Sequence, residues 1–129
     1  HGSGLDEAAV HGTTELAELK EDGTIERSTL TPADLGAKRL YSIEEIKGGA
    51  PADNALITEA ILAGKGTEAQ QAFVAANLAL LLKIGGLAKS LPEAVELARR
   101  TMASGKGLEV LNAHRAYAAS HTASSQKAA

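Results

Sequence analysis

The chain has 129 residues and a formal net charge of −3, which fits one ordinary domain with a usable core. Its basic residues are scattered and leave no footprint for nucleic acid or an anionic membrane, and its longest apolar stretch, residues 73–82, is too short to span a bilayer. Cysteine is absent, which excludes disulfides and thiolate metal sites, and the amino terminus lacks a signal-peptide pattern. We therefore expect a soluble, cytoplasmic protein.

The first residues, HGSGLDEAAVHG, run from a glycine-rich stretch into the adjacent acids Asp6 and Glu7. Taken alone, such a pair beside a flexible loop is most often a solvated turn. Residues 13–20 and 24–30 follow as two extended runs that flank Glu21-Asp22-Gly23. Asp-Gly tolerates the positive φ of a tight turn, so this pattern predicts a β-hairpin.

Helix signals replace strand signals from Thr31 onward. Thr31-Pro32 predicts a short turn that Gly36 ends. Ser42 to Glu45 forms a capping box before a short helix that ends at Gly48-Gly49.

Longer helices are expected in the rest of the chain. The first covers residues 51–62, the second follows a Thr67 cap and ends at Gly85-Gly86, and the third follows a Ser90 cap. The final helix begins after Gly105 or Gly107, and residues 120–129 are expected to form a frayed tail. The second helix is apolar on nearly every side and should be buried, with Asn77 as a polar packing group rather than a ligand.

The expected elements are one hairpin followed only by helices. A lone two-stranded hairpin is marginally stable in water and needs a larger sheet or helices to pack against. The chain also begins without methionine. We therefore expect a missing amino-terminal polypeptide, with the hairpin completing a sheet supplied elsewhere. The alternative is a self-sufficient small domain in which His1-Gly2-Ser3 is the remnant of a purification tag.

Several stretches in order resemble one family. They are HGSGLDE, TELAELKEDGTIERSTLTPADLG, GGAPADNALITEAILAGKG, AANLALLL and SGKGLEVL, and together they resemble the carboxy-terminal part of anthranilate phosphoribosyltransferase. Because HGSGLDE itself fits the family pattern, the interpretation of His1 as a remnant of a purification tag is disfavoured. The resemblance implies an α/β parent fold of the nucleoside-phosphorylase-like phosphoribosyltransferase type. Residues 1–119 would then be the carboxy-terminal part of its catalytic domain, as a β-hairpin followed by several helices.

The same resemblance implies the chemistry. The intact enzyme would transfer the phosphoribosyl group of phosphoribosyl pyrophosphate to anthranilate, would form a homodimer, and would hold Mg²⁺ through Asp6 and Glu7. Carboxylates suit this hard cation, which accompanies substrate phosphates. The family's upstream glycine-rich loop and anthranilate-binding residues are absent here, so this segment alone is expected to be inactive.

No catalytic side chain is assigned in this segment, since displacement of pyrophosphate needs no protein nucleophile. His11 and His114 lack an acidic partner at a telling spacing, so a solvated or capping role is favoured for both. Ala50 stands where the family usually has an acid or hydroxyl cap, which is a structural difference. Two alternatives remain: a non-catalytic helical module that binds a protein partner, and a related phosphoribosyltransferase or nucleoside phosphorylase fold.

Overall fold

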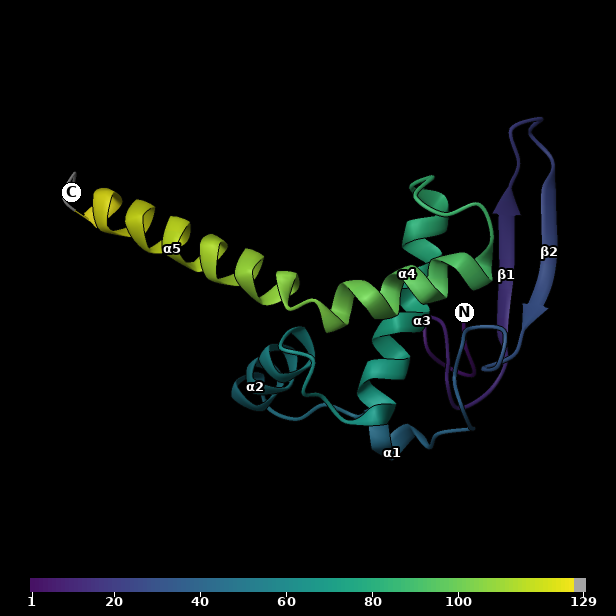
Figure 1. Ribbon diagram of the computed structural model, residues 1–129, viewed down its shortest axis with the longest axis horizontal. Helices are drawn as coiled ribbons and strands as arrows, with labels where there is room; N and C mark the ends of the chain where they lie inside the picture. The colour runs from purple at the N-terminus through teal and green to yellow at the C-terminus, as the bar shows by residue number, and fades with distance from the viewer. Residues whose placement is uncertain (127–129) are drawn as a thin grey trace.

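The computed structural model describes the backbone of residues 1–126 and the side chains of residues 1–121. Its elements, in chain order, are β1 (Thr14–Leu19), β2 (Ile25–Leu30), α1 (Ile43–Ile46), α2 (Pro51–Leu62), α3 (Glu68–Ile84), α4 (Leu91–Ala103) and α5 (Lys106–Gln126). The hairpin stands at one end of the molecule, α3 and α4 pack together in the middle, and α5 extends away at the other end (Figure 1).

The predicted hairpin is confirmed. The strands β1 and β2 pair antiparallel from Thr14 opposite Leu30 to Leu19 opposite Ile25. At the turn, Gly23 has a φ of +83°, which is the left-handed conformation that glycine adopts most easily. The Asp22 carboxylate accepts hydrogen bonds from the backbone and hydroxyl of Thr24, and these bonds lower the pKa of Asp22.

The predicted helix starts are also confirmed. At α3, Thr67 Oγ1 accepts the N–H of Gln70 at 3.2 Å, and Gln70 Oε1 accepts the N–H of Thr67 at 3.0 Å. Ser90 caps α4 by accepting the N–H of Glu93. At α2, Ala50 has no side chain that can cap the helix, but the Asp53 carboxylate accepts the N–H of Ala50 at 3.2 Å. These reciprocal bonds satisfy backbone donors that a helix leaves unpaired at its first turn.

The core consists mostly of small residues in two clusters that share α3. One cluster lies beneath the amino-terminal segment and comprises Ala8, Val10, Leu35, Tyr41, Ala69 and Ala76. The other lies between α3 and α4 and comprises Ala75, Ala79, Ala88, Ala94, Val95 and Ala98. Alanine on both facing helices lets their backbones approach closely. The helix α3 therefore connects the amino-terminal segment to the helical part of the molecule.

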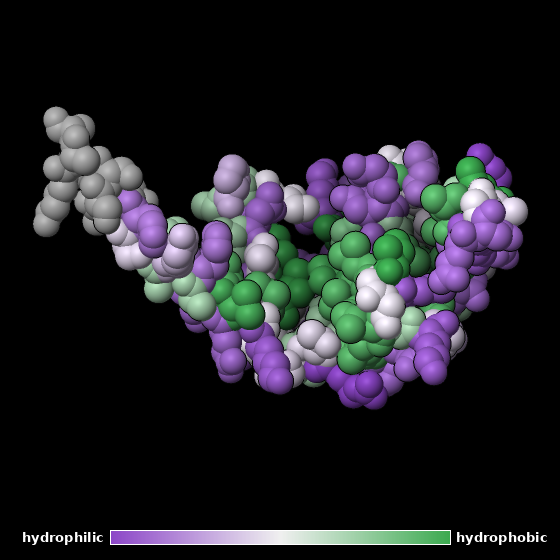
Figure 2. Space-filling view, turned by 90° about the horizontal axis from the view of Figure 1, so that it is seen from above, coloured by the Kyte–Doolittle hydropathy of each residue, from purple (hydrophilic) through white to green (hydrophobic). Residues whose placement is uncertain are grey.

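The prediction that α3 is buried on all sides is wrong. Only its alanines at positions 69, 75, 76 and 79 are buried, whereas Leu81 is 66% and Ile84 is 82% exposed. The amino-terminal segment and α4 cover two sides of α3, and Leu81 and Ile84 near its carboxy-terminal end remain exposed. Figure 2 shows hydrophobic side chains gathered on the face between α5 and the hairpin.

Two helix ends differ from expectation. The short helix α1 ends at Ile46, before the glycines that were expected to end it. The helix α5 continues to Gln126, past the tail boundary predicted at Ser120, and residues 127–129 lie outside the described residues. Extending an existing helix adds one hydrogen bond for each residue, so a helix that is already formed can continue past Ser120. Among the described residues, no helix is long and apolar enough to cross a membrane.

Candidate functional site

The amino-terminal segment forms a tight turn directly before the acidic pair. The N–H of Gly2 bonds the carbonyl of Leu5 at 3.0 Å, and the N–H of Leu5 bonds the carbonyl of Gly2 at 2.9 Å. Between them, Ser3 has a φ of +47° and Gly4 a φ of +97°, the pair of left-handed conformations that defines a type I′ turn. The turn therefore delivers Asp6 and Glu7 at a fixed point of the backbone.

Gly2 is required at its position because the chain after the acidic pair packs directly on it. Gly2 is buried, and an added Cβ would lie 2.5 Å from the nitrogen of Ala9 and 2.7 Å from the carbonyl oxygen of Glu7. Both distances are shorter than van der Waals contact. Any larger residue at position 2 would push the turn away from the backbone of Glu7.

Asp6 and Glu7 are both exposed at the end of this turn. Within the part of the chain that the structure describes, neither carboxylate has a hydrogen-bond or ion-pair partner. No group of three or more metal-ligating side chains gathers among the same residues. Magnesium commonly meets a protein through one or two carboxylates and completes its shell with water and substrate phosphates. Two free, adjacent carboxylates fit that donor set, so magnesium at this pair stays a prediction that the geometry permits.

The three residues after the acidic pair are buried, in contrast to the pair itself. Ala8 is 3% exposed, and Ala9 and Val10 are fully buried. The carbonyl of Val10 accepts the N–H of Tyr41 at 3.1 Å, which ties this stretch to the segment before α1. The acidic pair therefore stands at the boundary between a solvent-exposed turn and a packed, hydrogen-bonded backbone.

Two side chains from distant elements hold the backbone of this buried stretch. Asn77 of α3 accepts the N–H of Ala8 through Oδ1 at 2.9 Å and donates Nδ2 to the carbonyl of Ala8 at 3.1 Å. Thr14 of β1, only 2% exposed, accepts the N–H of Ala9 through Oγ1 at 2.9 Å. Asn77 was predicted to be a buried polar group that packs helices; instead it is half-buried and bonds the backbone of the loop beside the acidic pair. Its isolation among apolar residues was the one sequence signal for this role.

The two histidines occupy different environments. His11 is half-buried, its Nε2 lies 3.3 Å from the carbonyl oxygen of Ser3, and its Nδ1 is buried without a hydrogen-bond partner among the described residues. His114 is exposed on α5. Neither is paired with an acidic side chain in the described part of the chain. His114 is solvated as expected, and His11, which was expected to be solvated or capping, contacts the backbone of the turn before the acidic pair through its Nε2.

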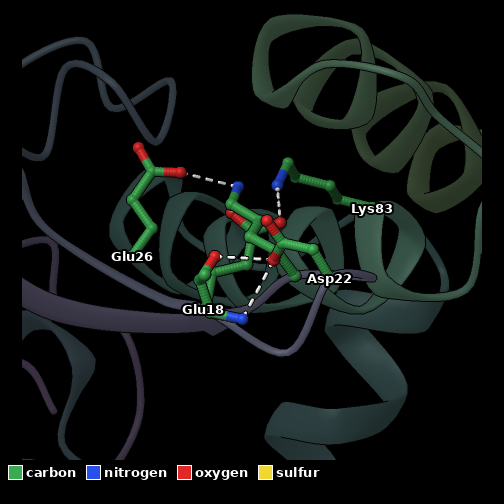
Figure 3. A network of polar contacts seen from close by, with 6 residues as sticks. Glu18, Asp22, Glu26 and Lys83 are labelled. Atoms are coloured by element: carbon green, nitrogen blue, oxygen red, sulfur yellow. Dashed lines mark hydrogen bonds and ion pairs between the residues drawn. The ribbon is translucent and has the colours of Figure 1, made fainter.

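A second polar connection joins α3 to the hairpin, away from the acidic pair. Lys83 of α3 donates to one carboxylate oxygen of Glu18 at 2.5 Å, and Lys20 donates to the other at 2.9 Å (Figure 3). Lys20 also pairs with Glu26 across the hairpin at 2.7 Å. Hydrogen bonds from Lys20 and Lys83 lower the pKa of Glu18 to about 2, and the bond to Glu18 raises the pKa of Lys20. This network attaches the hairpin to the helices by charge.

The fold is similar to one part of an α/β transferase, as a comparison with solved structures shows. The crystal structure of anthranilate phosphoribosyltransferase from Thermus thermophilus superposes with a TM-score of 0.81 at 30% sequence identity, covering 91% of this chain and 34% of that one. A family model described as "Glycosyl transferase family, a/b domain" matches residues 1–108. The chain therefore belongs to this glycosyl transferase family.

Curated relatives narrow the resemblance. Anthranilate phosphoribosyltransferase from Tolumonas auensis is 55% identical over 109 residues, which are 84% of this chain and 32% of the relative. The same enzyme from Shewanella putrefaciens is 54% identical over 112 residues, which are 87% of this chain and 32% of the relative. The resemblance found in the sequence is thus confirmed. The chain spans about one third of the length of these relatives.

Proposed function

We propose that this chain acts as part of an anthranilate phosphoribosyltransferase and supplies its magnesium-binding carboxylates, Asp6 and Glu7. The observation that carries the proposal is the pair itself: two exposed carboxylates without protein partners in the described residues, placed after a rigid type I′ turn. The names of the relatives and the family match support the transferase assignment. The alternative of a non-catalytic binding module finds no support among these relatives.

In the proposed reaction, the amino nitrogen of anthranilate forms a bond to the anomeric carbon of the ribose. The bond from that carbon to pyrophosphate breaks, its electron pair leaves with pyrophosphate, and the nitrogen loses a proton. Bound magnesium would neutralise the negative charge that grows on the departing pyrophosphate. This chain would hold Asp6 and Glu7 in one orientation, so that the protein does not have to reorganise during the reaction.

Their exposure gives the carboxylates room for water and substrate phosphate oxygens beside the protein ligands. The buried backbone of Ala8 to Val10 prevents the pair from drifting when charge moves. The mild negative charge of the chain agrees with a role in holding a cation rather than in attracting phosphate directly. The homodimer implied by the resemblance and the cytoplasmic location expected from the sequence, which has no cysteine, both belong to this proposal.

The test uses the complete gene product that contains this chain. Purified protein is supplied with anthranilate, phosphoribosyl pyrophosphate and Mg²⁺, and loss of anthranilate fluorescence is followed together with pyrophosphate release. We expect equal amounts of both, and no reaction after chelation by EDTA until Mg²⁺ is restored. Absence of turnover, or turnover that ignores chelation, would contradict the proposal. Sedimentation of the same sample tests the dimer.

A further inference from the structure

The amide of Asn77 holds both polar backbone groups of Ala8, the residue that follows the acidic pair. Its Oδ1 accepts the Ala8 N–H at 2.9 Å and its Nδ2 donates to the Ala8 carbonyl at 3.1 Å. The same Nδ2 donates to the carbonyl of Phe73, one turn earlier on α3, at 3.0 Å. This third bond orients the amide within its own helix, so the amide is already aimed when the loop packs on it.

The bonds from Asn77 to Ala8 also restrain the backbone of Glu7, because each peptide unit is planar. The Ala8 N–H belongs to the same rigid unit as the carbonyl of Glu7, so holding that N–H holds the plane attached to the Cα of Glu7. The Ala8 carbonyl belongs to the next peptide unit, so the side-chain amide of Asn77 holds the peptide units on both sides of Ala8. On another side, Gly2 lies against the Glu7 carbonyl, where no Cβ fits.

Thr14 repeats the arrangement one residue later. Its buried hydroxyl accepts the N–H of Ala9 at 2.9 Å. Two consecutive backbone donors after the acidic pair are therefore bonded to side chains, one from α3 and one from β1. A polar residue that served only helix packing would bond a neighbouring helix, whereas both of these bond the backbone beside Glu7.

We propose that Asn77, assisted by Thr14, is a positioning residue that sets the orientation of the Asp6-Glu7 carboxylates toward the metal. The inference rests on the proposed function, since it assigns a purpose to the fixed loop. Asn77 itself touches neither metal nor substrate in this scheme. Its removal should loosen the loop and weaken metal use while leaving the binding of anthranilate unchanged.

The first test measures the loop without metal or substrate, in the complete gene product that contains this chain. Hydrogen–deuterium exchange is followed in the peptide that covers residues 5–12 for wild type, Asn77→Ala and Thr14→Val. Leaving a backbone group of the loop without its hydrogen-bond partner costs enough free energy to make local opening about tenfold more frequent. We therefore expect exchange about tenfold faster in Asn77→Ala. Thr14→Val, which keeps the shape of the side chain, should show a smaller increase.

The matched control is Lys83→Gln. It removes the ion pair that joins α3 to Glu18 of the hairpin, so it disturbs an attachment of the same helix without touching the loop. Exchange in residues 5–12 and the dependence of activity on Mg²⁺ should both stay at wild-type values. If Asn77→Ala does not fold, Thr14→Val carries the test alone with the same control.

The second test measures function in the same proteins. The Mg²⁺ concentration for half-maximal turnover should rise about tenfold in Asn77→Ala, with KM for anthranilate unchanged, because the expected loosening of the loop is of that size. Binding of Mn²⁺ in the presence of pyrophosphate, followed by electron paramagnetic resonance, should weaken in parallel. Equal loop exchange and equal metal dependence in Asn77→Ala, Thr14→Val and Lys83→Gln would overturn the inference.

A double substitution separates this inference from the proposed function. If Asp6→Asn with Glu7→Gln keeps normal use of Mg²⁺, the proposed function fails and the positioning role fails with it. If that double variant loses Mg²⁺ use while Asn77→Ala behaves as the Lys83→Gln control, only the inference fails.

Discussion

Replacing Asp6 by Asn and Glu7 by Gln together removes two negative charges while keeping the size and shape of both side chains. Neither carboxylate is bonded to another group in the described residues, so the substitution breaks no native contact there. The turn before the pair is held by backbone bonds between Gly2 and Leu5, which remain. The free energy of unfolding should therefore change by no more than about 0.5 kcal/mol.

Activity should change far more than stability. Two opposite unit charges about 4 Å apart attract by about 4 kcal/mol where the effective dielectric constant is about 20. Solvent at this exposed site reduces that value, and water can replace part of the lost coordination. After these reductions we expect a loss of about 2.7 kcal/mol in transition-state stabilisation. This loss corresponds to a fall in turnover of about a hundredfold.

The assay is initial-rate turnover of the complete gene product across a range of Mg²⁺ concentrations. Apparent affinity for Mg²⁺ should fall with turnover, and KM for anthranilate should stay near its wild-type value. A matched control is Glu21→Gln with Asp22→Asn, an adjacent acidic pair at the hairpin turn that carries the same charge. Near-normal turnover of the Asp6 and Glu7 variant at limiting Mg²⁺ would return the pair to the role of a solvated turn.

Three further outcomes are expected. Residues 1–129 alone should give no product from anthranilate, phosphoribosyl pyrophosphate and Mg²⁺, and measurable product from this segment would contradict the proposed division of the site. Leu35→Ala should lower the free energy of unfolding by about 3 kcal/mol, because Leu35 is 1% exposed, whereas Leu40→Ala at a 65% exposed position should cost far less in the same denaturant titration. The pKa of Glu18 is lowered from 4.5 to about 2, so its pairing with Lys83 and Lys20 stabilises the fold above pH 4.5, and this contribution is lost as the pH falls toward 2. Unfolding midpoints of wild type and Glu18→Gln should therefore converge between pH 4.5 and 2, and a constant difference would refute the assignment.

Helix and hairpin boundaries could be predicted because their signals are local. The Thr67 and Gln70 side chains each bond the backbone of the other, three residues away, and this needs no tertiary partner. Asp22-Gly23 sets the hairpin turn in the same way. The stretch after Ser120 misled the prediction, because a helix that is already formed gains one hydrogen bond with each residue that extends it.

The acidic pair could be picked out in the sequence only through the resemblance to a family, since the composition and spacing of Asp6-Glu7 alone favoured a solvated turn. What the sequence determined by itself was therefore the elements, their caps and the family. Only the tertiary structure decided which sides of α3 are covered and that Asn77 bonds the backbone of Ala8, 69 residues away in the sequence. The physical reason is range: caps and turns are settled by bonds within a few residues, whereas the partner of a lone half-buried amide depends on which distant backbone the packed core brings to it.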